Sequence, residues 1–269
     1  TTSFWAVENK KKLKQNGIDF KCPRLEFYNL MSNKESFLKH CEKYGLRVPR
    51  ELDFKDILFK DNVQTNFVVK SRINCEDDNT ILEAPMLIEN KESLFEFRKK
   101  KIDISKHFAQ EYIKGPSVYY CAYYDKGDKI IDFSQKNIGQ QPGGRSVIKA
   151  IPYEISNLVT DKVDLMMKDM MWDGVMMIEF KEMDNEYYSI ECNPRFWGPI
   201  QIAIDNGVHF PAYVADVKEI LKTEKSKKYG YLWLVGYLRG IKFKKQTKTG
   251  FPRYKSDGNK IVFKEMWLR

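Results

Sequence analysis

The stretch that decides the fold reads Val175-Met-Met-Ile-Glu-Phe-Lys-Glu-Met-Asp-Asn-Glu-Tyr-Tyr-Ser-Ile-Glu-Cys-Asn-Pro-Arg195. Both of its halves are rich in β-branched, aromatic and Met side chains, which favour strands, and the polar residues 182–186 between them favour a turn. The stretch therefore predicts a β-hairpin, and the pairing of its two strands determines which side chains face one another.

That pairing brings acidic side chains together. If Phe180 faces Ile190, Glu179 lies directly opposite Glu191, and the two-residue period of a strand places Asn193 on the same face. Opposed carboxylates repel each other and destabilise an antiparallel pair unless a cation lies between them. Mg²⁺ takes oxygen ligands, usually one or two carboxylates with water and phosphate. The hairpin therefore predicts a magnesium site, and a solvated hairpin face is the alternative.

The residues after the hairpin extend this pattern into a family resemblance. Glu191-Cys-Asn-Pro-Arg195, followed by Phe-Trp-Gly-Pro-Ile-Gln-Ile-Ala-Ile-Asp-Asn-Gly-Val-His-Phe-Pro, resembles the end of the catalytic domain of ATP-grasp enzymes. That family uses ATP to turn carboxylates into acyl phosphates, which an amine or another nucleophile then attacks. Its metal ligands are a Glu in one strand and Glu-x-Asn in the next, so the resemblance assigns Mg²⁺ to Glu179, Glu191 and Asn193.

The resemblance covers roughly residues 33–217 and implies a fold class as well. It implies an α+β fold of two lobes, with the nucleotide bound between antiparallel sheets. The expected division is a remnant or linker of an N-terminal domain at 1–32, a small lobe at 33–107, a large lobe with the metal site at 108–228, and a basic C-terminal extension at 229–269.

Two lysines match the phosphate-binding lysines of the family. Lys34 opens a helical pattern that ends at Gly45, and Lys70 ends the apolar stretch Phe67-Val-Val-Lys70. A Lys ammonium is a compact point charge that suits phosphate oxygens. The chain has 46 Lys and Arg residues, so either lysine without this ordered context would indicate only a surface charge.

Residues 108–115 resemble the segment that links the two lobes. There the resemblance implies that main-chain groups near Tyr112 and Ile113 read the adenine edge. Glu111 and Ser117 are the candidates for the ribose contact. The acidic residue that usually follows the glycine of this segment is replaced by Pro116-Ser117, so the ribose ligand stays open.

Two arginines are candidates for binding the reacting groups. Arg145 lies in a glycine-rich turn, residues 140–146, which in relatives faces the acyl substrate, and a planar guanidinium can bind a carboxylate with two parallel hydrogen bonds. A simple Pro-Gly-Gly turn is the alternative. Arg195 matches the family's Arg that neutralises the transferring phosphoryl or acyl-phosphate oxygens. One departure is the stretch 71–80, which contains no glycine where many relatives have a glycine-rich flap.

Composition excludes several classes of protein. The 269 residues are 42% hydrophobic, enough for a sizeable core in one multi-lobed unit or two small domains. We find neither an apolar run of about 18 to 20 residues, as a membrane span requires, nor the order of a signal peptide. Five cysteines without C-x-x-C spacing favour a reducing cytosol, so we expect a cytoplasmic protein. The missing initiator Met suggests processing or a fragment.

The net charge of +9 is unevenly distributed. Residues 222–269 contain fourteen Lys or Arg and three acidic residues, whereas the rest of the chain is close to neutral. The charge is therefore not a nucleic-acid footprint of the whole protein, and we do not expect nucleic acid as its main partner. The tail has three readings: an extension that packs its aromatics on the body, a docking surface for an anionic substrate or partner, or a patch for membranes or nucleic acid.

Periodicity predicts helices and one core stripe. Leu158, Leu165, Met166 and Met170 recur at near-helical spacing and are expected to pack in the core. The expected helices are 1–16, 34–44, 91–100, 155–171 and 211–222.

The resemblance, together with the hairpin, implies an ATP-dependent ligase that activates a carboxylate as an acyl phosphate and joins it to an amine. ATP and Mg²⁺, or Mn²⁺ in its place, are the expected cofactors, the substrates are small molecules, and a homodimer is one option. The alternatives are a nucleotide-binding protein without ligase activity, and a basic module that binds through its tail.

Overall fold

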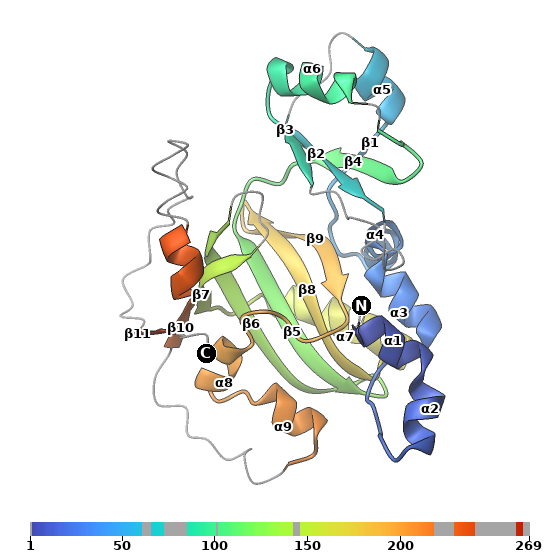
Figure 1. The fold of residues 1–269 in the computed structure, drawn as a ribbon, viewed down its shortest axis with the longest axis vertical. Coiled ribbons are helices and arrows are strands. Elements are labelled where there is room, and N and C mark those ends of the chain that lie inside the picture. The colour runs from blue at the N-terminus through green and yellow to red at the C-terminus, as the bar shows by residue number, and fades with distance from the viewer. Residues whose placement is uncertain are drawn as a thin grey trace.

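The computed structural model describes residues 2–60, 66–72, 85–100, 102–141, 146–217, 229–239 and, for the backbone, 262–265. Helices flank two sheets that are antiparallel in all but one strand pairing of the described residues (Figure 1), which confirms the α+β fold class. The helices are α1 Thr2–Glu8, α2 Lys10–Gln15, α3 Leu25–Ser32, α4 Lys34–Lys43, α5 Phe54–Phe59, α6 Lys91–Lys99, α7 Asn157–Asp169, α8 Gln201–Asp205 and α9 Phe210–Val214. The strands are β1 Glu51–Leu52, β2 Phe67–Ser71, β3 Met86–Ile88, β4 His107–Glu111, β5 Ser117–Asp125, β6 Asp128–Gln140, β7 Val147–Pro152, β8 Gly174–Met183, β9 Glu186–Asn193, β10 Tyr229–Leu232 and β11 Val262–Glu265.

The smaller sheet has the strand order β1-β4-β2-β3 and packs against α5 and α6. Its core joins Phe67 and Val69 of β2 to Phe97 of α6. A capping box, in which Asn90 and Ser93 each bond the other's backbone N–H, fixes the start of α6, because it satisfies two amides that have no partner within the helix. This sheet carries Lys70 on its strand β2.

The larger sheet has the order β11-β10-β7-β6-β5-β8-β9, and only the pairing of β10 with β11 is parallel among the described strands. Helices α3, α4 and α7 cover one face, where Tyr120 and Phe180 are buried. Helices α8 and α9 cover part of the other face, where Tyr119, Cys121 and Met177 are buried. Alternate residues of β5 and β8 thus point into different cores, and Glu179 belongs to the face with α8 and α9.

The four-part division of the chain remains a prediction. Helix α4 packs against β9 of the larger sheet, and β4 belongs to the smaller sheet. The boundaries at 33 and 108 therefore run close to, but not along, the borders between the two cores.

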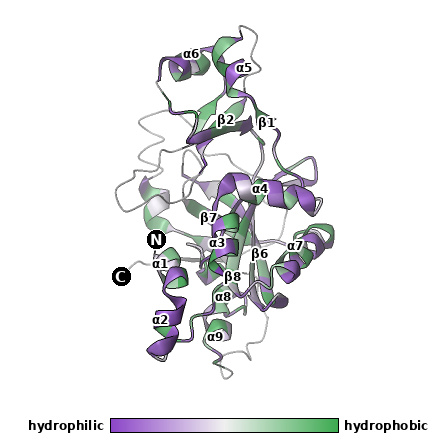
Figure 2. Cartoon of the chain, turned by 90° about the vertical axis from the view of Figure 1, so that its right-hand side faces the viewer, coloured by the Kyte–Doolittle hydropathy of each residue, from purple (hydrophilic) through white to green (hydrophobic). Residues whose placement is uncertain are grey.

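The prediction for the core stripe of α7 was right for the methionines and wrong for the leucines. Met166 and Met170 are 0% and 2% exposed, whereas Leu158 and Leu165 are 77% and 54% exposed. Seven residues are almost two helical turns, so the leucines share one stripe, and that stripe lies roughly 100° away from the methionines. Figure 2 shows hydrophobic and hydrophilic residues side by side on α7.

The expected helices 34–44, 91–100 and 155–171 appear as α4, α6 and α7. The first pattern is divided at Asn9 into α1 and α2, and α9 is shorter than expected within the described residues. Helices α3, α5 and α8 were not predicted, because each is too short to show a period clearly.

Candidate active site

The hairpin of β8 and β9 places the two glutamates as predicted: Glu179 pairs with Glu191. The expected pairing of Phe180 with Ile190 was wrong, since Phe180 pairs with Ser189 and the register shifts between Glu179 and Phe180. A bulge opposes two residues of one strand to one of the other and increases the local twist. The carboxylate pair therefore lies directly beside an irregularity of the sheet.

Each carboxylate has its own polar neighbours. The Ser117 hydroxyl donates to Glu179 Oε1 at 2.5 Å, and the Asn193 amide donates to Glu191 Oε1 at 2.9 Å. The Lys34 ammonium lies 3.7 Å from Glu191 Oε2. Burial, and next the charge of Glu191, raise the pKa of Glu179. Glu191 thus disfavours the charged form of Glu179, although Lys181, Ser117 and Lys70 oppose this shift.

Cationic side chains approach the pair from several elements. Lys34 opens α4, and its helix is fixed by the Asn33 side chain, which accepts a hydrogen bond from the Ser36 amide at 3.0 Å. Lys70 of β2 is buried, and burial, assisted by the charge of Lys34, lowers its pKa to about 8 although Glu191 and Glu179 oppose the shift. Helix α4 and strand β2 thus each contribute a lysine to one group of charges.

Arg195 lies immediately after β9 and bonds Asn193. Its Nη2 lies 3.2 Å from Asn193 Oδ1, and its Nη1 donates to the Phe196 carbonyl at 3.0 Å. The amide oxygen that would bind a metal is therefore held by the guanidinium. If Asn193 Oδ1 turned to a cation, the guanidinium would become free to bind an anion.

The linker, residues 112–116 between β4 and β5, has one backbone amide that forms a hydrogen bond and one that is available to a ligand. The Tyr112 N–H donates to the Asn66 carbonyl at 3.0 Å, whereas the Ile113 N–H has no hydrogen bond to another described residue. Glu111 accepts a hydrogen bond from the Arg50 amide at 3.0 Å. Ser117 is fully buried beneath Glu179, so its hydroxyl supports the carboxylate, and its role as a ribose ligand remains a prediction.

Two of the predicted features cannot be placed. Arg145 lies outside the described residues, as does most of the glycine-free stretch 71–80. The roles that the sequence suggests for them remain predictions.

The donor set suits a hard cation. Glu179 and Glu191 provide carboxylate oxygens, and Asn193 adds an amide. Among the described residues we find no group of three or more His, Cys, Asp or Glu side chains placed to hold a metal. Two carboxylates and an amide leave coordination positions for water and phosphate oxygens, as Mg²⁺ requires.

Sequence reasoning missed Lys181. It follows Glu179 by two residues in β8 and therefore shares its face; its ammonium donates to the Gly115 carbonyl at 3.2 Å. Burial lowers the pKa of Lys181, and Glu179 opposes this shift. The same i+2 spacing that placed Asn193 beside Glu191 would have found it.

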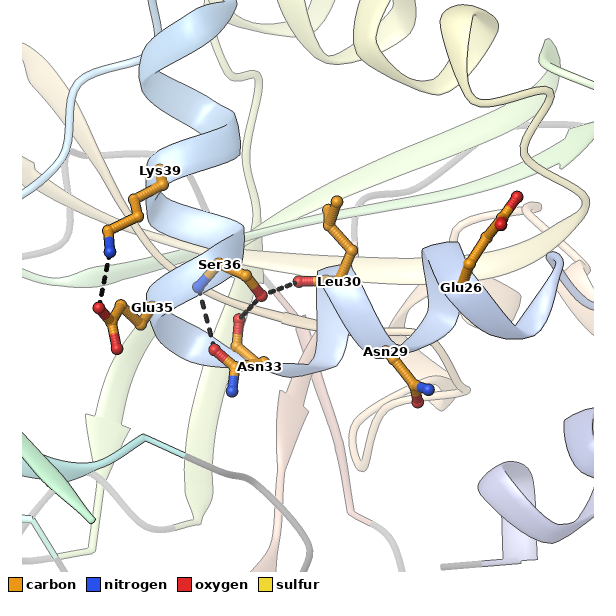
Figure 3. A pocket seen from close by; sticks show the side chains of 7 residues that line it. All are labelled: Glu26, Asn29, Leu30, Asn33, Glu35, Ser36 and Lys39. Carbon is orange, nitrogen blue, oxygen red and sulfur yellow. Dashed lines mark hydrogen bonds and ion pairs between the residues drawn. The ribbon is translucent and has the colours of Figure 1, made fainter. Parts of the chain in front are cut away.

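A surface pocket of about 470 Å³ lies elsewhere, at the corner between α3 and α4. Figure 3 shows Glu35, Ser36 and Lys39 of α4 lining it. These residues lie about 100° to 200° around the helix from Lys34, so the pocket opens on a different side of α4. It is not the site of the carboxylate pair.

Comparison with known proteins gives matches by structure alone. No protein-family model matches the chain, and no curated protein sequence does. The biotin carboxylase domain of Hydrogenobacter thermophilus 2-oxoglutarate carboxylase, in complex with MgADP, ADP and bicarbonate, matches with a TM-score of 0.60 and 16% identity. Biotin carboxylase from Campylobacter jejuni matches with a TM-score of 0.61 and 15% identity. N5-carboxyaminoimidazole synthetase from Staphylococcus aureus, complexed with ADP, matches with a TM-score of 0.59 and 17% identity.

The matches cover most of this chain and a smaller part of the others. They span 82%, 82% and 83% of this chain, but 52%, 53% and 61% of the three solved structures, in the same order. The chain thus corresponds to between half and two thirds of their length. Within the described residues, the structure has no helix with the length and apolar character of a membrane span.

Proposed function

From the ATP-grasp fold, which the chain shares with these carboxylase and synthetase structures, we propose that it acts as an ATP-dependent ligase that activates a carboxylate and joins it to an amine. The observation that carries the proposal is the opposed pair Glu179 and Glu191, with Asn193 on the same face. The ADP and MgADP complexes of the solved structures support ATP and Mg²⁺ as its cofactors.

The proposed metal site consists of Glu179, Glu191 and Asn193. A bound Mg²⁺ would supply charge neutralisation for the β- and γ-phosphate oxygens. The two carboxylates would hold the cation and lose their mutual repulsion to it, and Ser117 orients Glu179 through its hydroxyl. Asn193 would offer the metal the amide oxygen that now bonds Arg195, and the guanidinium would then be free for the transferring phosphoryl group.

The remaining groups bind ATP and align it with the carboxylate substrate. Lys34 and Lys70 approach the carboxylates from α4 and β2, where both ammonium groups can bind phosphate oxygens. The backbone amide of Ile113, in the linker, is available to bind the base of the nucleotide. Phosphoryl transfer to a carboxylate depends mainly on alignment and charge neutralisation, so these groups suffice without a protein nucleophile. Arg145 remains the candidate clamp for the substrate carboxylate.

The test of the nucleotide site is calorimetric titration with a non-hydrolysable ATP analogue, with and without Mg²⁺. We expect Mg²⁺-dependent binding by the unmodified protein and a loss of at least about tenfold in Glu191→Ala, because a charge-assisted ligand is removed. Glu186→Gln is the matched control, since this exposed glutamate lies at the far end of β9 and pairs with Arg47. Equal affinity in all three proteins would contradict the metal assignment.

Nucleotide binding without turnover is the second candidate, favoured by the stretch 71–80, which has no glycine. Backbone amides approach phosphate less freely where glycine is absent. Release of ADP that depends on an added carboxylate and amine distinguishes the two functions. A ligase releases ADP only with its substrates, and a binding protein releases none with any carboxylate and amine tested.

A further inference from the structure

Lys181 is a partly buried lysine at the site to which neither the resemblance nor the metal chemistry assigns a role. It lies two residues after Glu179 on the same face of β8. Its ammonium is directed to the main chain, where it donates to the Gly115 carbonyl at 3.2 Å. Gly115 belongs to the linker between the lobes, so Lys181 joins the strand of the metal carboxylate to the segment proposed to bind the base.

Two more contacts hold the linker to the same strand. The Glu182 N–H donates to the Pro116 carbonyl at 3.1 Å. The Cα of Gly115 lies so close to the Glu182 carbonyl that a Cβ at this position would clash with the backbone. Gly115 and Pro116 of the linker therefore contact Lys181 and Glu182 of β8, once through a side chain and twice through the main chain.

We propose that Lys181, together with Gly115, fixes the distance between the base-binding linker and the metal-binding carboxylates, and so selects a nucleoside triphosphate over a polyphosphate that has no base. The inference rests on the proposed function. A nucleotide has its base and its phosphates at a set covalent separation. If the linker and the metal-binding carboxylates are already held at this separation, the site binds the base and the phosphates together without first ordering the linker. This increases the affinity for the nucleotide.

Lys181 could instead attract any polyanion through its charge. These two roles differ in their effect on a ligand that has phosphates and no base. A positioning residue strengthens binding only when the base is present, whereas a general cationic residue strengthens binding of nucleotide and polyphosphate alike.

The experiment measures, by calorimetry, the binding of the Mg²⁺ complexes of a non-hydrolysable ATP analogue and of tripolyphosphate. For Lys181→Met we expect the ATP analogue to bind about tenfold more weakly, as for loss of a hydrogen bond from a charged donor. We expect tripolyphosphate to bind within about twofold of the unmodified protein. Lys181→Arg retains a donor and is expected to restore most of the analogue's affinity.

Lys136→Met is the matched control, because Lys136 pairs with Glu182 at 2.7 Å on the opposite face of the sheet. Gly115→Ala provides a second route to the same effect: it moves the linker away from β8 while Lys181 stays, and should weaken the analogue selectively. This variant decides the matter if Lys181→Met does not fold.

If Lys181→Met weakened the binding of the ATP analogue and of tripolyphosphate equally, or changed the binding of neither, the inference would be overturned while the proposed nucleotide site would stand. Failure of the unmodified protein to bind the ATP analogue would overturn the proposed function itself. The two failures are therefore distinguished within one set of titrations.

Discussion

At the scale of single residues, the site is shaped by a conflict between two carboxylates. Glu179 and Glu191 face each other across an antiparallel pair, where like charges cost up to about 1 kcal/mol. We expect Glu179→Gln to raise the free energy of unfolding of the metal-free protein by less than about 1 kcal/mol, since Gln still accepts the Ser117 hydrogen bond while the attraction of Glu179 to Lys70 and Lys181 is lost. Urea denaturation in the presence of a chelator measures this change.

The same variant should lose the stabilisation that Mg²⁺ and nucleotide give to the unmodified protein. Glu186→Gln, at an exposed position of the hairpin, is expected to change neither quantity. A Glu179→Gln protein that is less stable than the parent without metal would show that the carboxylate contributes to folding, in contradiction to a site arranged for binding.

Cysteine reactivity provides a second residue-scale prediction. Burial raises the pKa of the Cys41 thiol to about 12, and burial raises the pKa values of Cys121 and Cys192 as well. Only a thiolate reacts with iodoacetamide at an appreciable rate. We therefore expect mass spectrometry to find these three cysteines unmodified after labelling of the native protein at pH 8 and modified after labelling in denaturant. Labelling of Cys41 in the native protein would contradict its placement in the core between α4 and β9.

At the scale of elements, the hairpin of β8 and β9 could be predicted and its irregularity could not. Alternating residue types and a polar turn specify a hairpin and the face of each side chain. The bulge beside Glu179 depends on how Phe180 packs among buried residues of the larger sheet, and a local pattern does not contain that information. The same limit explains α7, in which periodicity located the helix but not which of two apolar stripes faces the core.

The turn of this hairpin is formed by Asp184 and Asn185, with φ values of 53° and 62°. Both values are left-handed, as a two-residue type I′ turn requires. Asn185→Val should lower the free energy of unfolding by about 1 to 2 kcal/mol, because a β-branched residue is strained in this region. Asn185→Gly, which adopts positive φ freely, is the control and should not destabilise the protein in the same urea denaturation.

Helix α4, which presents Lys34, should make stability depend on pH through His40. Burial, and next the charge of Lys43, lower the pKa of His40 from its usual value. As the pH falls through the ordinary range near 6.5, the unfolded chain takes up this proton before the folded protein does, so stability decreases. We expect His40→Gln to decrease the slope of stability against pH between 7 and 5.5. An unchanged slope would show that His40 is not responsible.

At the scale of the whole molecule, the sequence predicted the α+β class, the fold and the pair of opposed carboxylates. It could not predict how the linker meets β8, because Gly115 contacts residues that are distant in the sequence. Lys181 lies 66 residues after Gly115, and Glu182 lies 67 residues after it. Nor could it place the C-terminal residues: Val262–Glu265 adds a strand beside β10. This strand supports the interpretation in which part of the tail packs on the body.

A ligand that contacts both sheets should stabilise the entire chain. A non-hydrolysable ATP analogue with Mg²⁺, at one hundred times its dissociation constant, is expected to raise the free energy of unfolding by about 2.7 kcal/mol. Removal of Mg²⁺ with a chelator should abolish most of this gain, because the carboxylates would again repel each other and the phosphates. Thermal unfolding followed by calorimetry gives both values, and a gain that persists in the chelator would contradict a metal-dependent site.

The most direct test of the account is the position of a metal ion in crystals grown with Mn²⁺ and a non-hydrolysable ATP analogue. Mn²⁺ takes the same oxygen ligands as Mg²⁺, and its anomalous scattering identifies it. If both glutamates are metal ligands, an anomalous peak will lie between Glu179 and Glu191, within about 2.0 to 2.4 Å of an oxygen of each. A bound nucleotide whose metal contacts neither carboxylate would contradict the account.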